Sequence, residues 1–297
     1  MELSRTQFDV LSFLESAKGR TTQRGIAGAT DLSLGTVNRT LAQLAGTGLI
    51  AQGRISARGI GALEPYRVQR AIFFAAGFGA RLVPVTLNTP KSLIRVKGVR
   101  IIDTLLDAVS AAGIEEILIV RGHFGEQFDQ LLYKYPGLEF LENPLYNESN
   151  NISSAMCARY RLQNAYVLEA DLLLRNPRLI TRYQYSSNYL GVPVEVTDDW
   201  CFETKNGIIT KLRVGGRNCH HMFGVSYWDR RDGAKLAGHI RQVYEMPGGR
   251  ERFWDQAPLE YFKGDYEIAV RECTFDDIAE IDTISELRRL DESYCGV

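Results

Sequence analysis

The residues best suited to chemistry stand in one uninterrupted stretch, Gly77-Phe78-Gly79-Ala80-Arg81-Leu82-Val83-Pro84-Val85-Thr86-Leu87-Asn88-Thr89-Pro90-Lys91-Ser92-Leu93. The stretch follows an apolar run from Ala71 to Ala76, which predicts a short buried strand. Glycines after such a strand allow backbone N–H groups to approach phosphate closely. Arg81 and Lys91 would neutralise the phosphate charge. We therefore predict a phosphate-binding loop.

Two familiar kinds of phosphate loop do not fit this stretch. A dinucleotide-binding loop would need a third glycine, and Leu82 stands at that position. The Gly-Lys-Ser/Thr ending of a P-loop is absent. The arginine, the prolines, the threonine and the lysine thus indicate a loop of a third kind.

The spacing of these residues resembles GxGxRxxPxTxxxPKxL, the signature of sugar-phosphate and alcohol-phosphate nucleotidyltransferases. Further stretches are similar to the bacterial CTP:phosphocholine cytidylyltransferases, and the resemblance covers about residues 69–291. They are Asn143–Tyr146, Asn150–Ser154, Glu169–Asp171, Asp199–Trp200, Val225–Asp229, Trp254–Asp255 and Glu280–Asp282. The resemblance implies an enzyme that transfers CMP from CTP to phosphocholine, which gives CDP-choline and pyrophosphate for the decoration of surface glycopolymers.

The same resemblance implies a magnesium site at Asp171 and Asp282. Asp171 follows the predicted strand Tyr166–Ala170, and ligands bind at the carboxyl ends of strands in open α/β sheets. Mg²⁺ takes one or two protein carboxylates and completes its octahedron with phosphate and water oxygens. Either aspartate could instead cap a helix, Asp282 together with Glu286.

The resemblance also divides the remaining site residues between catalysis and nucleotide binding. Arg81, Lys91 and Asp171 would be catalytic. CTP would be held by the loop and by the start of a helix, where free N–H groups favour anions, although simple capping explains the second group as well. The predicted nucleotide-binding residues are Ala75, Ala76, Gly77, Phe78, Gly79, Arg81, Asn151, Ser153 and Ser154.

An acceptor that carries choline would need aromatic side chains, because a quaternary ammonium has no N–H to donate. The candidates are Asp199, Trp200, Tyr227, Trp228, Phe253 and Trp254, with Asp199 and Trp200 foremost. We expect at least two of the five aromatic residues to be ordinary packing. Phosphoethanolamine and 2-aminoethylphosphonate are the alternative acceptors, since their primary ammonium would favour carboxylates.

The elements that must position these residues alternate from residue 69 onward. Apolar runs at 71–76, 117–120, 138–141 and 166–170 predict buried strands, and helices are predicted at 101–112 and 152–161. Residues 188–226 are predicted to form antiparallel strands with a turn at Lys205–Gly207, and further helices are predicted near 230–245 and 283–291. The fold class is therefore α/β, a Rossmann-like nucleotidyltransferase domain over 69–297 with a mixed, mainly parallel sheet.

Residues 1–68 differ from the rest of the chain. They hold eight basic and five acidic residues, a net charge of +3, and three short helical patterns followed by a strand or turn. The order resembles a winged helix-turn-helix domain, in which Ser33, Thr36, Asn38, Arg39 and Gln43 of the third helix could contact DNA. A helical packing or dimerisation module is the alternative. A DNA-binding regulator with a nucleotide-sensing C-terminal domain also stays open.

Composition limits the remaining possibilities. The 297 residues carry a formal charge of −1, so bulk charge does not indicate a polyanion-binding protein. Five scattered cysteines without a CxxC pair favour a reducing compartment. The N-terminus lacks the pattern of a secretory signal, and no apolar run is long enough for a membrane helix. We therefore expect a cytoplasmic protein that does not bind membranes.

Overall fold

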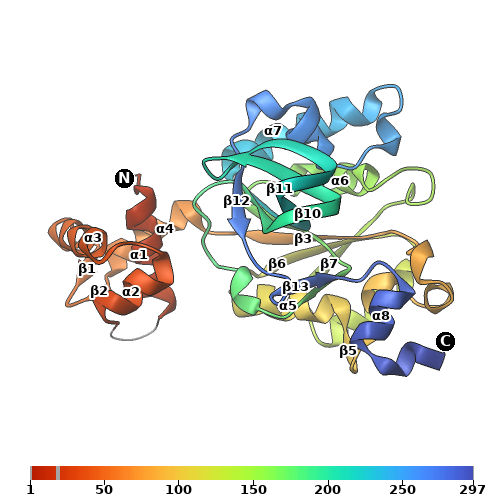
Figure 1. Ribbon diagram of the computed structural model, residues 1–297, viewed down its shortest axis with the longest axis horizontal. Helices are drawn as coiled ribbons and strands as arrows, with labels where there is room; N and C mark the ends of the chain where they lie inside the picture. The colour runs from red at the N-terminus through yellow and green to blue at the C-terminus, as the bar shows by residue number, and fades with distance from the viewer. Residues whose placement is uncertain (1, 18–20, 297) are drawn as a thin grey trace. The chain divides into compact units, whose positions relative to one another are not determined.

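The computed structural model describes residues 2–17 and 21–296, which form two compact units. The first unit contains the chain up to Arg67 together with Tyr183–Tyr185, and the second contains 68–182 and everything from Ser186 onward. Figure 1 shows the chain up to Arg67 in red to orange, and the second unit from orange at strand β3 to dark blue at the C-terminus.

The first unit is built from short capped helices. Helix α1 (Arg5–Ser16) begins at Ser4, which forms a capping box with Gln7. Helices α2 (Gln23–Thr30) and α3 (Leu34–Gly46) follow, and Thr22 and Ser33 cap their N-termini. Strands β1 (Ile50–Ala51) and β2 (Arg54–Ile55) form an antiparallel hairpin, and helix α4 (Ala57–Leu63) ends the unit.

A separate piece of chain completes the core of this unit. Tyr183 is buried in the cluster that holds Phe8, Leu11 and Leu44. Tyr185 stacks on Tyr66 with ring centroids 5.6 Å apart. The sequence around residue 183 gives no sign of this placement.

A seven-stranded sheet in the order β10-β12-β11-β8-β3-β6-β7 forms the centre of the second unit. Strands β3 (Arg70–Ala75), β6 (Glu116–Arg121), β7 (Leu138–Glu142) and β8 (Ala165–Glu169) pair in parallel. Strand β11 (Ile208–Trp228) pairs antiparallel with β8 and with β10 (Asn188–Lys205), and β12 (Ala269–Glu272) lies parallel to β10. The predicted mixed, mainly parallel sheet is confirmed.

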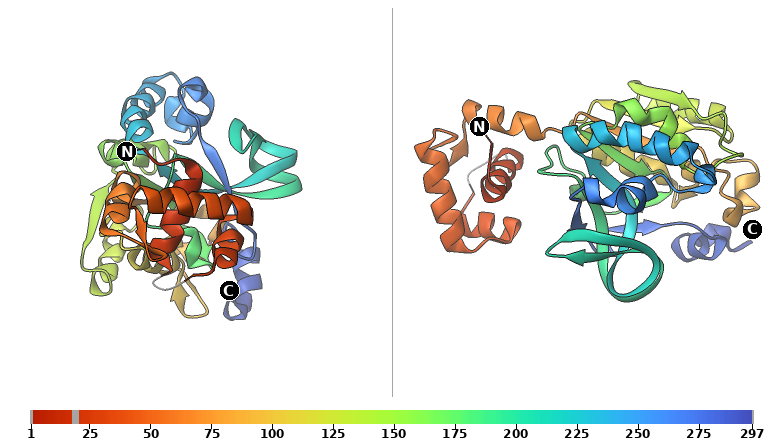
Figure 2. Two further views of the ribbon diagram at one scale, coloured as in Figure 1. Left: turned by 90° about the vertical axis from the view of Figure 1, so that its left-hand side faces the viewer. Right: turned by 90° about the horizontal axis from the view of Figure 1, so that it is seen from above.

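Helices cover both faces of this sheet, so its central strands are apolar on both sides (Figure 2). Helix α5 (Ile101–Ala111) buries Ile102, Leu105 and Val109 in one core. In the other core, helix α6 (Ile152–Ala158) buries Ile152 and Ala155, and helix α7 (Arg230–Glu245) buries Leu236 and Ile240. The predicted helix over 152–161 ends as α-helix at Ala158 and continues as a 3₁₀ turn to Arg161.

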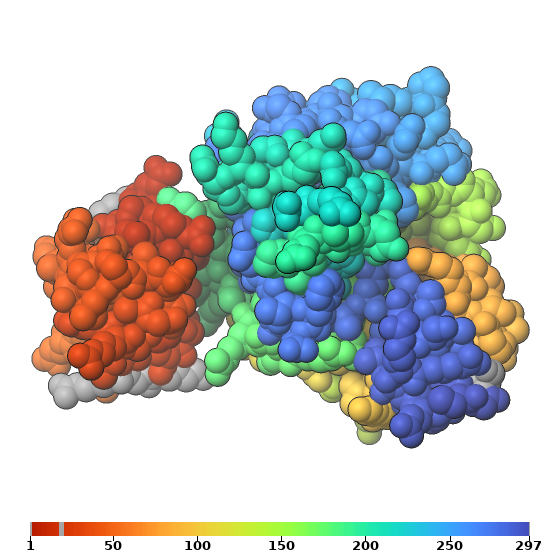
Figure 3. All heavy atoms as spheres, in the orientation of Figure 1, coloured from red at the N-terminus to blue at the C-terminus, as the bar shows by residue number. Residues whose placement is uncertain are grey.

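Strands β10 and β11 form a long hairpin whose turn lies at Asn206 and Gly207, as the sequence predicts. Both turn residues have positive φ, 52° and 75°, which suits Asn-Gly. Figure 3 shows this hairpin, in teal, on the same face of the second unit as the dark blue C-terminal segment.

Two further strand pairs lie outside the seven-stranded sheet. Strand β9 (Leu172–Leu174) pairs with β13 (Ile278–Glu280), β4 (Arg95–Val96) pairs with β5 (Val99–Arg100), and helix α8 (Ile284–Leu290) follows β13. Among the described residues, no helix combines the length and the apolar character that crossing a membrane requires.

Candidate active site

A cavity of about 300 Å³ opens where β3 and β8 end. Three groups of residues line it: the glycine loop, the segment before α6, and a set of acids. They are Phe74, Ala76, Gly77 and Arg81; Asn143, Tyr146, Ser149, Asn150, Asn151, Ser153 and Ser154; and Glu169, Asp171, Glu280 and Asp282, with Phe253 at one side. Ligands bind at this end of parallel strands in open α/β sheets.

Lys91 joins the two predicted metal ligands. Its Nζ lies 2.5 Å from Oδ2 of Asp171 and 2.6 Å from Oδ1 of Asp282. Arg81 reaches the other oxygen of Asp282, with Nη2 2.9 Å from Oδ2. The three residues predicted to be catalytic thus meet at one point.

Lys91 and Asp282 hold each other in their charged forms. Burial opposes the charge of Lys91, but Asp171 and Asp282 outweigh it and raise the lysine's pKa above its usual range. Burial likewise opposes the charge of Asp282, but the charges of Lys91 and Arg81 lower the pKa of that carboxyl. Lys91 and Asp282 are therefore charged near neutral pH.

Gly79 allows Lys91 to reach this position. The residue has φ 69°, and a Cβ there would lie 3.0 Å from Cβ of Lys91 and 3.2 Å from Cγ2 of Thr86. Thr86 donates from its hydroxyl to the carbonyl of Gly79, which fixes the loop. The second glycine of the signature is thus explained by backbone conformation and close packing.

The β9–β13 pair brings the two aspartates together across more than a hundred residues of sequence. Leu172 pairs with Glu280, and the amide of Ile281 donates to the carbonyl of Asp171 at 3.4 Å. The capping alternatives are wrong for both aspartates, since a strand follows Asp171 and Thr283 caps α8.

Two further acids, which the sequence analysis did not assign to the site, lie beside Asp171. Oxygen atoms of Glu169, Asp171 and Glu280 all lie within 4.8 Å of one another. Each glutamate stands two residues before a predicted ligand, in Glu169-Ala170-Asp171 and Glu280-Ile281-Asp282. This repeated Glu-x-Asp spacing is the signal that could have found them.

The acidic set fits a hard divalent cation. Oδ1 of Asp171 is buried and has no hydrogen-bond partner among the described residues. Carboxylate oxygens are the ligands that Mg²⁺ prefers. Burial, with the charges of Asp171 and Asp255, raises the pKa of Glu169 to about 8, and burial with the charge of Asp171 also raises the pKa of Glu280. A bound cation would relieve this repulsion.

The raised pKa of Glu169 predicts a pH-dependent stability. The folded state binds this proton more tightly than the unfolded chain does, so the stabilisation is complete below about pH 4.5 and declines as pH rises toward 8. Glu169→Gln should flatten this decline in metal-free urea unfolding, while Glu148→Gln, an exposed glutamate, should not. An equally steep decline in Glu169→Gln would contradict the assignment.

The segment before α6 is held by side-chain hydrogen bonds rather than by capping. Nδ2 of Asn143 donates to the hydroxyls of Ser153 at 2.9 Å and Ser154 at 3.1 Å. Asn151 makes no capping bond. Its Nδ2 instead donates to Glu169 at 3.2 Å, and its Oδ1 accepts from the amide of Trp254 at 2.9 Å.

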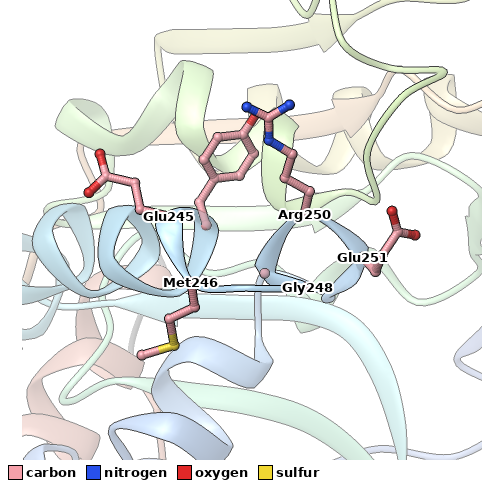
Figure 4. A pocket seen from close by; sticks show the side chains of 7 residues that line it. Glu245, Met246, Gly248, Arg250 and Glu251 are labelled. Atoms are coloured by element: carbon pink, nitrogen blue, oxygen red, sulfur yellow. The ribbon is translucent and has the colours of Figure 1, made fainter.

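A loop at the end of α7 supports this segment from outside. The loop lines a second cavity of about 520 Å³, where Arg250 lies beside the ring of Tyr244 (Figure 4). The carbonyl of Arg250 accepts hydrogen bonds from the amide of Asn150 and the hydroxyl of Ser149, both at 2.8 Å. A residue that lines the second cavity is thus hydrogen-bonded to two residues that line the first.

Most of the predicted nucleotide-binding residues line the first cavity. Ala76, Gly77, Arg81, Asn151, Ser153 and Ser154 do so, and Ala75, Phe78 and Gly79 do not. The half-exposed ring of Phe78 packs edge-on against His123 with centroids 4.6 Å apart.

The predicted acceptor residues are largely dispersed. Phe253 lines the cavity. Trp200 packs edge-on against the ring of Phe253, with ring centroids 5.5 Å apart. Asp199 does not line the cavity, and its Oδ1 accepts from the amide of Trp200.

Three of the aromatic candidates are core residues. Tyr227, Trp228 and Trp254 expose 2% of their surface or less and do not line the cavity, so their prediction as acceptor contacts is wrong. Tyr227 and Trp228 are consecutive on β11, so they point to opposite faces of the sheet, and each face is covered. The expectation that at least two of the five aromatic residues serve as packing is met.

Comparison with known proteins agrees with this geometry. The chain is 34% identical over 228 residues to the 2-aminoethylphosphonate cytidylyltransferase of Lancefieldella rimae, which covers 75% of this chain and 92% of that protein. The chain belongs to the cytidylyltransferase family of nucleotidyltransferases. The choline-phosphate cytidylyltransferase of Streptococcus pneumoniae is 31% identical over 229 residues, with coverage of 75% and 97%.

The fold and both parts of the chain match known models. The solved CTP:phosphocholine cytidylyltransferase of Streptococcus pneumoniae superposes with a TM-score of 0.71 at 31% identity, over 76% of this chain and 99% of that one. Residues 71–191 match the MobA-like NTP transferase domain, and residues 2–57 match the MarR family. This cytidylyltransferase thus carries a winged helix before its enzyme domain, as the sequence predicts.

Proposed function

We propose that the chain transfers CMP from CTP to the phosphate or phosphonate of a short amine, and that a primary ammonium is preferred to choline. The observation that carries the acceptor preference is the composition of the cavity. Of the five aromatic residues expected around choline, only Phe253 lines it and three are buried in the core, while two acids besides the predicted metal ligands, Glu169 and Glu280, do line it. A primary ammonium can donate three hydrogen bonds to carboxylates, and a trimethylammonium can donate none. Phosphoethanolamine and 2-aminoethylphosphonate both meet this description.

The reaction brings two anions together, so its barrier is lowered by positioning and charge neutralisation. An oxygen of the acceptor attacks the α-phosphorus of CTP in line, and the bond from that phosphorus to the pyrophosphate oxygen breaks. Arg81 and Lys91 would stabilise the charge on the phosphates. Asp171 and Asp282, with Glu169 and Glu280 nearby, would hold Mg²⁺, which neutralises phosphate charge when bound.

A panel of substrates tests this proposal. Pyrophosphate release should be measured for each of the four ribonucleoside triphosphates with phosphocholine, phosphoethanolamine and 2-aminoethylphosphonate. We expect CTP to be required, EDTA to abolish turnover, and a primary-ammonium acceptor to exceed phosphocholine at least about tenfold in kcat/KM, a difference of about 1.4 kcal/mol. A preference for UTP or a purine nucleotide would refute cytidylyl transfer, and a tenfold preference for phosphocholine would refute the acceptor assignment.

Phe253 provides a sharper test of where the acceptor lies. Its ring lines the cavity and is 36% exposed, so it can contact an ammonium group. Cation–π contacts contribute about 0.5–2 kcal/mol, so Phe253→Ala should raise the KM of the acceptor about two- to thirtyfold and leave the KM of CTP unchanged. Phe275→Ala, an exposed phenylalanine outside the cavity lining, is the control. An equal rise in both KM values would place Phe253 on the nucleotide side.

We further propose that the winged helix binds DNA weakly. Helix α3 exposes Asn38, Arg39 and Gln43, which are residue types that contact phosphates and base edges. Arg39→Gln in the full chain should weaken a gel shift on DNA from the protein's own operon at low salt. Arg241→Gln, an exposed arginine on α7 with the same charge change, should not. Absence of any low-salt shift with the unmodified protein would favour a structural role.

A further inference from the structure

A basic cavity of about 340 Å³ lies at the opposite ends of the strands that build the active site. Its lining includes Arg70 at the start of β3, Tyr160 and Arg161 after α6, and Arg230 at the start of α7. None of its lining residues lines the active-site cavity, so the two cavities are separate.

The cavity has an excess of positive charge. Arg70 and Arg161 share one carboxylate, since Nε of Arg70 lies 2.9 Å and Nη1 of Arg161 lies 2.7 Å from the oxygens of Glu116. Arg230 is exposed and forms no ion pair with any residue that the structure describes. Glu139 lies 3.6 Å from Arg161 as a second carboxylate, so the three guanidinium groups and two carboxylates leave a net charge of about +1.

A buried amide in the lining has unused hydrogen-bonding capacity. Asn164 is 8% exposed, and its Oδ1 is buried without a hydrogen-bond partner among the described residues. Its backbone is fixed in the left-handed region, with φ 49°, while its carbonyl accepts from the amide of Gln69 at 2.8 Å. Buried polar atoms in native proteins nearly always have partners, so an unpartnered one in a cavity wall indicates a bound molecule.

We propose that this cavity binds a small phosphate-bearing molecule. Guanidinium groups recognise phosphate oxygens through paired hydrogen bonds, and Arg230 is free to do so. The side chain of Asn164 would hydrogen-bond a hydroxyl or amine of the same ligand. The volume is within the range of small-molecule sites.

The ligand would contact elements that also reach the active site. Strand β3 runs from Arg70 to the residues that line the active cavity, and β8, which begins directly after Asn164, runs to Glu169. The segment from Asn151 to Arg161 likewise contributes residues to both cavities, with its first residues in the active-site lining and its last in the basic cavity. Rigid elements of this kind can couple the occupancy of one site to the other.

Calorimetric titration of the full chain without metal tests the proposal, with inorganic phosphate and CMP as separate probes. We expect Arg230→Gln to weaken the affinity of both at least about fivefold. Arg231→Gln, the next residue on the same helix and outside the cavity, is the matched control and should change it less than twofold. Asn164→Asp keeps the shape of the side chain and adds a negative charge, so it should abolish binding.

Lys91→Gln separates this site from the active site, because it removes an active-site cation that does not line the basic cavity. Since this substitution also lowers stability, the titration is done under conditions in which circular dichroism shows the variant to be folded. Retention of binding in Lys91→Gln together with its loss in Arg230→Gln would support the proposal, whatever the outcome for cytidylyl transfer. Tighter binding of CMP than of phosphate would identify a nucleotide, and equal binding would identify the phosphate group alone. Loss in Lys91→Gln with retention in Arg230→Gln, equal effects of Arg230→Gln and Arg231→Gln, or no binding of either probe would overturn it.

Discussion

Replacement of Asp171 by Asn is expected to reduce turnover at least about 10²-fold while the fold is retained. The substitution keeps the volume of the side chain and removes the charge that faces both Lys91 and the proposed cation. Removal of one of several crowded carboxylates also relieves repulsion with Glu169 and Glu280. Steady-state turnover with CTP at several Mg²⁺ concentrations, together with urea unfolding, measures both effects.

Asp282→Asn should behave in the same way, and the double variant should be little worse than either single one. When two residues bind the same ion, removal of either one already impairs what the ion does, so the losses in turnover are not additive. Asp276→Asn, an exposed aspartate near β13, is the matched control. Near-normal turnover of Asp282→Asn at limiting Mg²⁺ would show that this carboxylate only holds Lys91 and Arg81.

Replacement of Lys91 by Gln is expected to cost about 3–5 kcal/mol of folding free energy as well as activity, because it leaves two largely buried carboxylates without their shared cation. The midpoint of urea unfolding should fall without a change in slope. Added Mg²⁺ should restore more stability to this variant than to the unmodified protein, since the acids then lack their own ammonium.

Lys134→Gln is the control for this experiment, because Lys134 pairs with Asp107 at an exposed position. Equal stability of Lys91→Gln and the unmodified protein in the absence of metal would mean that the lysine and the two aspartates do not stabilise one another.

The local patterns of the sequence predicted the sheet and the loop well. The apolar run before Gly77 and the runs at β6, β7 and β8 are short, continuous and bounded, so periodicity and length sufficed to find them. The Asn206-Gly207 turn likewise has a conformational requirement that can be recognised in sequence.

The parts that could not be predicted depend on contacts between distant segments. The sequence analysis assigned Tyr227 and Trp228 to ligand binding. They are buried because both faces of β11 are covered, which the local sequence does not show. Glu169 and Glu280 join the site because β9 pairs with β13, two strands of three residues each that carry little signal of their own. Asp199 and Trp200 both lie on strand β10 of the long hairpin. Only Trp200 packs against Phe253, a contact between segments that are far apart in sequence.

The packing of Tyr183–Tyr185 in the first unit affects which fragments of the protein are suitable for expression. An expression plasmid that stops after Arg67 would omit Tyr183 and Tyr185, and with them the partners of Phe8 and Tyr66. The excised fragment would expose aromatic surface and tend to aggregate. Deletion of the N-terminal helices would likewise leave Tyr183 and Tyr185 without the side chains against which they pack. Experiments on either half are therefore better done by point substitution in the intact gene than by truncation.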